Sequence, residues 1–137
     1  MRGWIRDPHS GGAKISEALK AETKRCLLAH AEKHYTGRYA KLDIRFRASF
    51  CYIDTYKEPD PKAKPWSGSG ETLAAFRERM GNTPTHLSRL RYCGKNQWSV
   101  AFFTYSNEEY ESSMMATGSF YGTPKDGFDV GAIYLQD

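Results

Sequence analysis

The sequence predicts an α+β domain in which a four-stranded, mainly antiparallel sheet packs one face against an N-terminal and a C-terminal helix. The chain has 137 residues, of which 39% are hydrophobic and 14% aromatic. This size and composition suit one folded domain and exclude a disordered chain. Residues 41–56 alternate between apolar and polar side chains, as strands do, and residues 16–35 repeat apolar positions at helical spacing. We therefore expect one domain over residues 1–137, with an N-terminal arm at residues 1–15.

The first expected element is a helix from Ser16 to Tyr35. Ser16 can cap it, Glu17 suits the positive end of the helix dipole, and Gly37 can end it. One face of this helix carries the residues Ile15, Leu19, Thr23, Cys26, Leu27, His30 and His34.

The next segment predicts one long strand from Lys41 to Tyr56. Its even positions are apolar from Leu42 to Tyr52, and its odd positions include Arg45 and Arg47. Period-two alternation over this length is typical of a strand with one apolar and one basic face.

Three further strands and two further helices are expected. Residues 57–70 contain three prolines and two glycines and predict an extended loop, followed by a short helix from Glu71 to Met80. A hairpin of His86–Tyr92 and Trp98–Tyr105 follows, and then a strand between Tyr110 and Tyr121. Thr123, Pro124 and Asp126 predict the start of the last helix, which Gly127 and Gly131 weaken.

The distribution of charge along the chain is uneven. The net charge is +4, but residues 1–97 hold 19 Lys and Arg against 10 Asp and Glu, and residues 98–137 hold one Lys against six acids. This uneven distribution favours one of two arrangements. Either the basic part, residues 1–97, forms a surface that binds polyanions, or the acidic part, residues 98–137, folds back onto this basic body.

Other classes of protein are excluded. No apolar run is long enough for a membrane span, and the N-terminus lacks the apolar core of a secretory signal. Cys26, Cys51 and Cys93 are widely spaced and odd in number, which argues against a disulfide framework and a zinc site. Reduced thiols favour a cytoplasmic protein, and we expect no cofactor and no membrane partner.

Several segments resemble a small group of bacterial proteins of similar length that have no assigned function. These segments are Asp7-Pro-His-Ser-Gly-Gly12, Leu42-Asp-Ile-Arg-Phe-Arg47, Phe50-Cys-Tyr-Ile-Asp54 and Thr83-Pro-Thr-His-Leu87 with Arg89-Leu-Arg-Tyr92. The resemblance implies a bacterial, cytoplasmic origin and carries no catalytic residue across.

The main candidate site is the outer face of the sheet. If the apolar residues of each strand face the helices, the outer face presents Arg45, Arg47, Arg89, Arg91, Phe103 and Tyr105. Arginines among aromatic rings on an open sheet can neutralise phosphates and stack bases. The alternative is that these arginines pair with Glu109 and Glu111 on the neighbouring strand.

A second candidate is an anion site at Arg6, His9 and Ser10, where a glycine turn leads into the first helix. The alternative is a polar arm lying on the surface. His30 and His34 share a helix face, but a zinc site needs a third ligand such as Asp54 or Glu32, and nothing in the sequence requires one to lie there, so we assign no metal site. Asp43 and Asp54 are about 35 Å apart on a single straight strand and cannot share a site without a bend, so we discount this pair.

The sequence thus favours a non-enzymatic binding protein that engages nucleic acid or another polyanion through its basic, aromatic sheet face. The alternative is a protein-interaction module, or a subunit of a homo-oligomer, that pairs its basic body with an acidic partner. We assign no catalytic residue, and we expect Trp66 to pack back and pin its own loop to the core.

Overall fold

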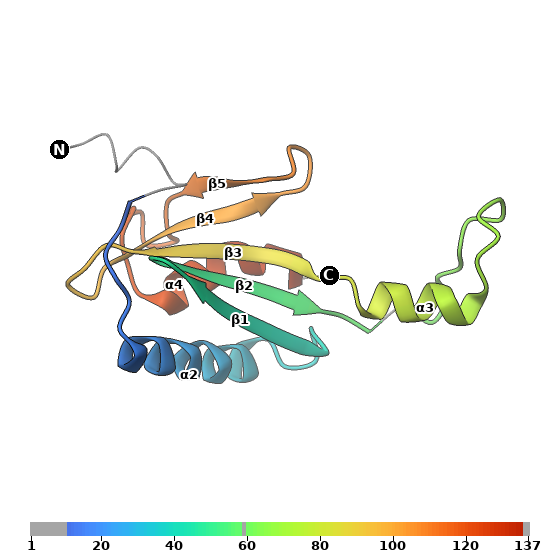
Figure 1. The fold of residues 1–137 in the computed structure, drawn as a ribbon, viewed down its shortest axis with the longest axis horizontal. Helices are drawn as coiled ribbons and strands as arrows, with labels where there is room; N and C mark the ends of the chain where they lie inside the picture. The colour runs from blue at the N-terminus through green and yellow to red at the C-terminus, as the bar shows by residue number, and fades with distance from the viewer. Residues whose placement is uncertain (1–10, 59, 136–137) are drawn as a thin grey trace.

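The computed structural model describes residues 11–58 and 60–135, which form a five-stranded antiparallel sheet with helices (Figure 1). The strands are β1 (Lys41–Arg47), β2 (Phe50–Tyr56), β3 (Thr85–Tyr92), β4 (Trp98–Thr104) and β5 (Glu109–Ser113). The helices are α2 (Glu17–His34), α3 (Leu73–Gly81) and α4 (Pro124–Gly131), and the 3₁₀ helix η1 (Ala132–Leu135) follows α4. Each strand pairs with the next along the chain, so the sheet is a simple meander. The α+β class and the antiparallel sheet are confirmed.

The expected number of four strands is wrong, because residues 41–56 form a hairpin rather than one strand. Arg47 pairs with Phe50, and the two residues between them make the turn, where Ala48 adopts a φ of 54°. The turn therefore changes which positions face the core, from even-numbered residues in β1 to odd-numbered residues in β2. Phe50 and Tyr52, expected on the apolar face, lie on the same side as Arg45, while Cys51 and Ile53 are fully buried in the core.

The first and last helices begin where their capping residues predict. The Ser16 hydroxyl accepts a hydrogen bond from the Leu19 amide at 3.1 Å and caps α2. Thr123 and Asp126 form a reciprocal capping box before α4, with Pro124 in the first turn. These local interactions satisfy amides that the helix itself leaves without partners.

The glycines of α4 allow a close approach to the sheet. A Cβ atom at Gly131 would lie 2.4 Å from the carbonyl oxygen of Leu87, and one at Gly127 would lie 2.3 Å from a methyl group of Leu90. Both glycines lower helix propensity, yet they let α4 pack directly on β3.

The core lies between one face of the sheet and the two helices α2 and α4. Leu27 and Ala31 of α2, Phe128 of α4 and Leu90 of β3 are fully buried there, and Trp98 of β4 is almost fully buried. In Figure 1, α4 runs behind β3 and α2 lies below β1. The opposite face of the sheet, which we call the outer face, therefore points away from both helices.

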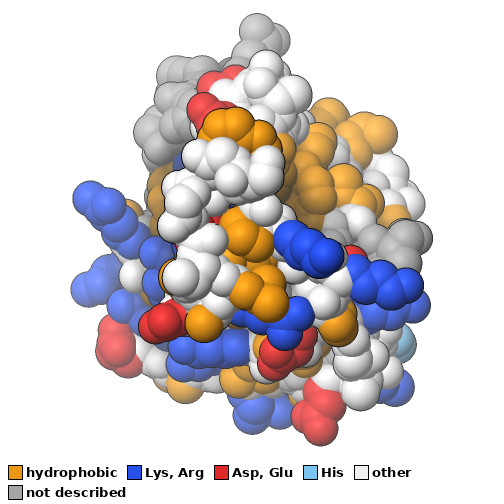
Figure 2. Space-filling model, turned by 90° about the vertical axis from the view of Figure 1, so that its right-hand side faces the viewer, with side chains coloured by type: hydrophobic (Ala, Val, Ile, Leu, Met, Phe, Trp, Pro, Cys, Tyr) orange, Lys and Arg blue, Asp and Glu red, His pale blue; other side chains and the backbone are white. Residues whose placement is uncertain are grey.

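The connection from β2 to β3, residues 57–84, projects beyond the end of the sheet and carries α3 (Figure 1). We call this segment the α3 arm. Thr72 caps α3, and Phe76 is its buried residue. Trp66 does not pin the arm to the core as expected, since its side chain is 75% exposed and its ring lies over Gly68. Seen end-on in Figure 2, the arm places hydrophobic side chains at the centre of the view, with Lys and Arg around them.

Candidate functional site

The strand register brings basic and aromatic side chains together on the outer face. Arg45 is opposite Tyr52, which is opposite Arg89 on β3, and Arg47, Phe50 and Arg91 form the next row. The six residues that the sequence predicts for this face, Arg45, Arg47, Arg89, Arg91, Phe103 and Tyr105, all belong to strands β1, β3 and β4 or directly follow them. The sheet therefore gathers them from segments that are far apart in the chain.

The four arginines differ in exposure. The Arg45 side chain is 53% exposed and Arg47 is exposed, whereas Arg89 and Arg91 are only 8% and 4% exposed. The Arg89 guanidinium lies between the rings of Phe50 and Tyr110, at 4.5 and 4.8 Å from their centres. Arg91 donates a hydrogen bond from Nε to the Ser99 hydroxyl at 3.2 Å. Arg45 and Arg47 are therefore the arginines of this group that a ligand can reach, while Arg89 supports the rings.

A polar network that the sequence analysis discounted lies beside these arginines. The hairpin makes Asp43 and Asp54 direct cross-strand neighbours, so the expected separation of about 35 Å, which assumed one straight strand, is wrong. Arg45 bridges the two carboxylates, with Nε 3.1 Å from Asp43 Oδ2 and Nη2 2.7 Å from Asp54 Oδ2. The partners of Arg45 are thus Asp43 and Asp54. Glu111, which with Glu109 formed the alternative set of partners, accepts hydrogen bonds from Thr104 and Asn107.

His86 joins this network through an irregularity in the pairing of β2 with β3. Ile53 pairs with Ser88, but the next residue, Asp54, pairs with His86, so Leu87 is an extra residue on β3. This β-bulge keeps Leu87 buried in the core while it turns His86 to the outer face. There His86 Nδ1 lies 2.8 Å from Asp54 Oδ1. Sequence reasoning missed this pair, because a bulge leaves no local pattern in the surrounding residues.

Aromatic rings surround His86. Its ring centre lies 4.8 Å from that of Phe103 and 6.5 Å from that of Tyr105, which it stacks against almost in parallel. The Tyr105 hydroxyl also accepts a hydrogen bond from the His86 amide at 2.7 Å. Burial, together with the negative charge of Asp54, raises the pKa of Tyr110 well above its usual value. Its phenol therefore stays protonated and can donate a hydrogen bond.

A pocket of about 610 Å³ opens on this face. It is lined by Arg45, Phe46, Arg47, Tyr52, His86 and Tyr110. Cationic, aromatic and imidazole groups thus converge on one hollow, which suits an anionic ligand with a planar group.

A second histidine–carboxylate pair lies between α2 and α4. His30 Nε2 is 2.7 Å from Asp129 Oδ1, and the Tyr35 hydroxyl donates to the same oxygen at 2.8 Å. The rings of His30 and His34 are 4.7 Å apart, as their helical spacing predicts. Within residues 11–58 and 60–135 no group of three or more His, Cys, Asp or Glu side chains is arranged to hold a metal ion. We interpret the pair as a link between the two helices.

The predicted anion site at Arg6, His9 and Ser10 lies outside the described residues. The residues that follow are held against the sheet, because the Ala13 amide donates to the Tyr92 carbonyl at 2.7 Å. The Ser49 hydroxyl of the β1–β2 turn also donates to the Gly11 carbonyl.

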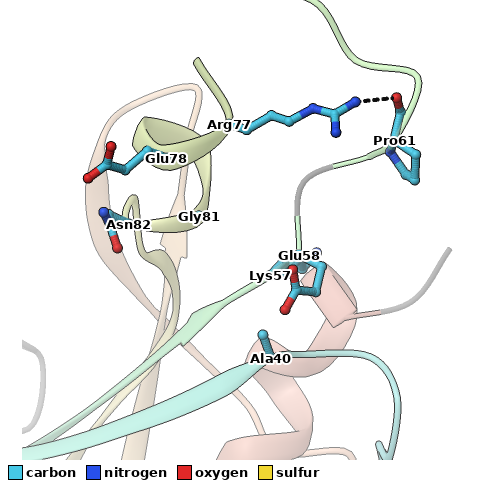
Figure 3. Close-up of a pocket in the computed structure, with 8 residues that line it drawn as sticks. All are labelled: Ala40, Lys57, Glu58, Pro61, Arg77, Glu78, Gly81 and Asn82. Atoms are coloured by element: carbon cyan, nitrogen blue, oxygen red, sulfur yellow. Dashed lines mark hydrogen bonds between the residues drawn. The ribbon is translucent and has the colours of Figure 1, made fainter. Parts of the chain in front are cut away.

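Another hollow, of about 480 Å³, lies beneath the α3 arm (Figure 3). It is lined by Ala40, Lys57, Glu58, Pro61, Arg77, Glu78, Gly81 and Asn82. Figure 3 shows that these side chains do not converge, since Arg77 reaches toward the Pro61 carbonyl while Glu78 and Asn82 lie on the other side of the helix. The outer face therefore remains the stronger candidate site.

Comparison of the chain with protein-family models, curated proteins and solved structures found no match. Among the described residues, none of the helices combines the length and the hydrophobicity that a membrane span requires.

Proposed function

We propose that this protein binds single-stranded nucleic acid through the outer face of its sheet. The observation that carries the proposal is the pocket in which exposed Arg45 and Arg47 meet the rings of Tyr52, Tyr110 and His86. Phosphates are bound by arginine side chains, and unpaired bases stack on aromatic rings. A single strand presents both groups at once, whereas a duplex hides its bases.

Within this site the roles of the residues differ. Arg47, at the end of β1 beside the turn, is exposed and contacts phosphate. Arg45 is held by two carboxylates that offset its charge, so it shapes the wall of the pocket beside Tyr52. Phe103 and Tyr105, next to His86, extend the aromatic surface along β4 for a second base.

Fluorescence anisotropy tests the proposal with labelled single-stranded RNA, single-stranded DNA and duplex DNA at about 50 and 200 mM salt. We expect saturable binding of the single strands that weakens steeply with salt. Arg47→Ala removes one phosphate contact and lowers the slope of log affinity against log salt by about 0.7. Lys24→Ala, an exposed cation on α2 away from the sheet, is the matched control and leaves the slope unchanged.

The alternative is a protein-interaction module, and the exposed Trp66 of the α3 arm favours it. The same titrations separate the two functions. A module that contacts only proteins shows no saturable binding of any oligonucleotide at about 50 mM salt, and this result would contradict the proposed function.

A further inference from the structure

His86 is held in one orientation by a buried carboxylate. Asp54 is only 3% exposed and accepts from both Arg45 Nη2 at 2.7 Å and His86 Nδ1 at 2.8 Å. Because a carboxylate paired with arginine only accepts hydrogen bonds, Nδ1 carries the hydrogen. The other ring nitrogen, Nε2, is then left with its lone pair and can accept a proton.

This imidazole is accessible to a ligand in the pocket. The His86 side chain is 33% exposed and lines the pocket together with Arg45 and Arg47. His30 provides an internal comparison, because it also contacts a carboxylate, Asp129, but its side chain is only 11% exposed. His30 lies against Phe128 and Tyr35 instead of beside a cationic pocket.

The bulge at Leu87 brings His86 and Asp54 together. A regular ladder would place Leu87 opposite Asp54 on the outer face and turn His86 toward the core. The extra residue instead keeps Leu87 buried and sets His86 against Asp54. Bulges that redirect a side chain are frequent next to active sites.

We propose that His86, positioned by Asp54, is the general base of a site that cleaves single-stranded RNA without a metal ion. This inference rests on the proposed function, since it needs a phosphodiester bound beside Arg47. His86 Nε2 takes the proton of a ribose 2′-hydroxyl, and the 2′-oxygen attacks the adjacent phosphorus. The bond from phosphorus to the 5′-oxygen breaks, the leaving oxygen takes a proton from water, and the imidazolium returns its proton to solvent.

The products are a 2′,3′-cyclic phosphate and a free 5′-hydroxyl, and no further reactant is needed. Arg47 stabilises the negative charge that grows on the phosphate oxygens during the attack. DNA lacks the 2′-hydroxyl, so it binds to the same face and is not cleaved.

The test incubates labelled single-stranded RNA containing all sixteen dinucleotide steps with the protein in EDTA, and identifies the products by mass spectrometry. Wild type, His86→Gln and His30→Gln are purified in parallel. We expect cyclic-phosphate products from wild type and His30→Gln, and a rate lowered by about 100-fold or more in His86→Gln. Anisotropy with DNA of the same sequence measures binding separately. We expect it to be unchanged in His30→Gln, and weakened in His86→Gln by a smaller factor than the cleavage rate, because His86 also lines the pocket.

The other possible results contradict the catalytic inference, the proposed function or both. Binding of RNA and DNA without any cleavage contradicts the catalytic inference and leaves the proposed function standing. Absence of both binding and cleavage contradicts both. Equal cleavage by wild type and His86→Gln shows that His86 is not the base, and loss of cleavage in His30→Gln shows that the effect is not specific to the outer face.

Discussion

Arginines that look equivalent in the sequence have different roles in the structure. Arg45 and Arg47 on β1 and Arg89 and Arg91 on β3 each alternate with apolar residues. On β3 the arginines lie in the middle of the sheet with strands on both sides, so their neighbours bury them. On β1, an edge strand, they stay accessible. Position in the sheet, rather than residue type, therefore decides which arginine can meet a ligand.

Arg89 gives a direct test of this difference. Its planar guanidinium lies between the rings of Phe50 and Tyr110. Lysine keeps the charge but has a compact, strongly hydrated ammonium that cannot lie flat between two rings. We expect Arg89→Lys to lower the free energy of unfolding by about 1–2 kcal/mol, measured by chemical denaturation. Arg47→Lys, at an exposed position, is the control and changes stability by less than about 0.5 kcal/mol. Equal stability of the two variants would show that the stacked guanidinium is not stabilising.

At the scale of elements, the β1–β2 turn determines both the strand count and the site. It places Asp54 beside Asp43 and moves Tyr52 to the outer face. The turn itself contains Ala48 and Ser49, without the glycine or asparagine that usually marks a two-residue hairpin. Ala48 takes a positive φ of 54°, which L residues with a side chain adopt at a cost.

Substitution of Ala48 distinguishes a hairpin from a continuous strand. Valine favours strands, but it is strongly disfavoured at positive φ, whereas glycine accepts it. We expect Ala48→Val to lower the free energy of unfolding by about 1–2 kcal/mol. We expect Ala48→Gly to be at least as stable as the wild type. Thermal and chemical denaturation measure both. A valine variant more stable than the glycine variant would indicate one continuous strand over residues 41–56.

The elements that the sequence predicted correctly are those with local signals. Ser16 and Thr123 cap their helices through hydrogen bonds to residues three positions away, so the sequence alone can place them. The hairpin turn and the bulge at Leu87 depend on cross-strand pairing instead. The four arginines, Phe103 and Tyr105 could therefore be assigned to the outer face from alternation. The position of Tyr52 on that face and the contact of His86 with Asp54 could not.

At the scale of the whole molecule, the outer face and the α3 arm are separate features. The pocket is lined by residues of β1, β2, β3 and β5, whereas the arm projects beyond the end of the sheet (Figure 1). Among the described residues, α3 has no extensive packing contact with another helix or strand. The arm can therefore change without disturbing the sheet.

Limited proteolysis tests this independence. Lys62 is exposed in the arm and is followed by alanine, so we expect trypsin to cleave there first. The two fragments stay together because β2, before the cut, remains paired with β3, after it. They co-elute in size-exclusion chromatography, and the nicked protein keeps its affinity for single-stranded nucleic acid. Lys62→Gln removes the early cut and serves as the control. First cleavage within β1, at Arg45 or Arg47, would show that this edge strand opens more readily than the arm. Separation of the fragments after the cut at Lys62 would show that the sheet depends on an intact arm.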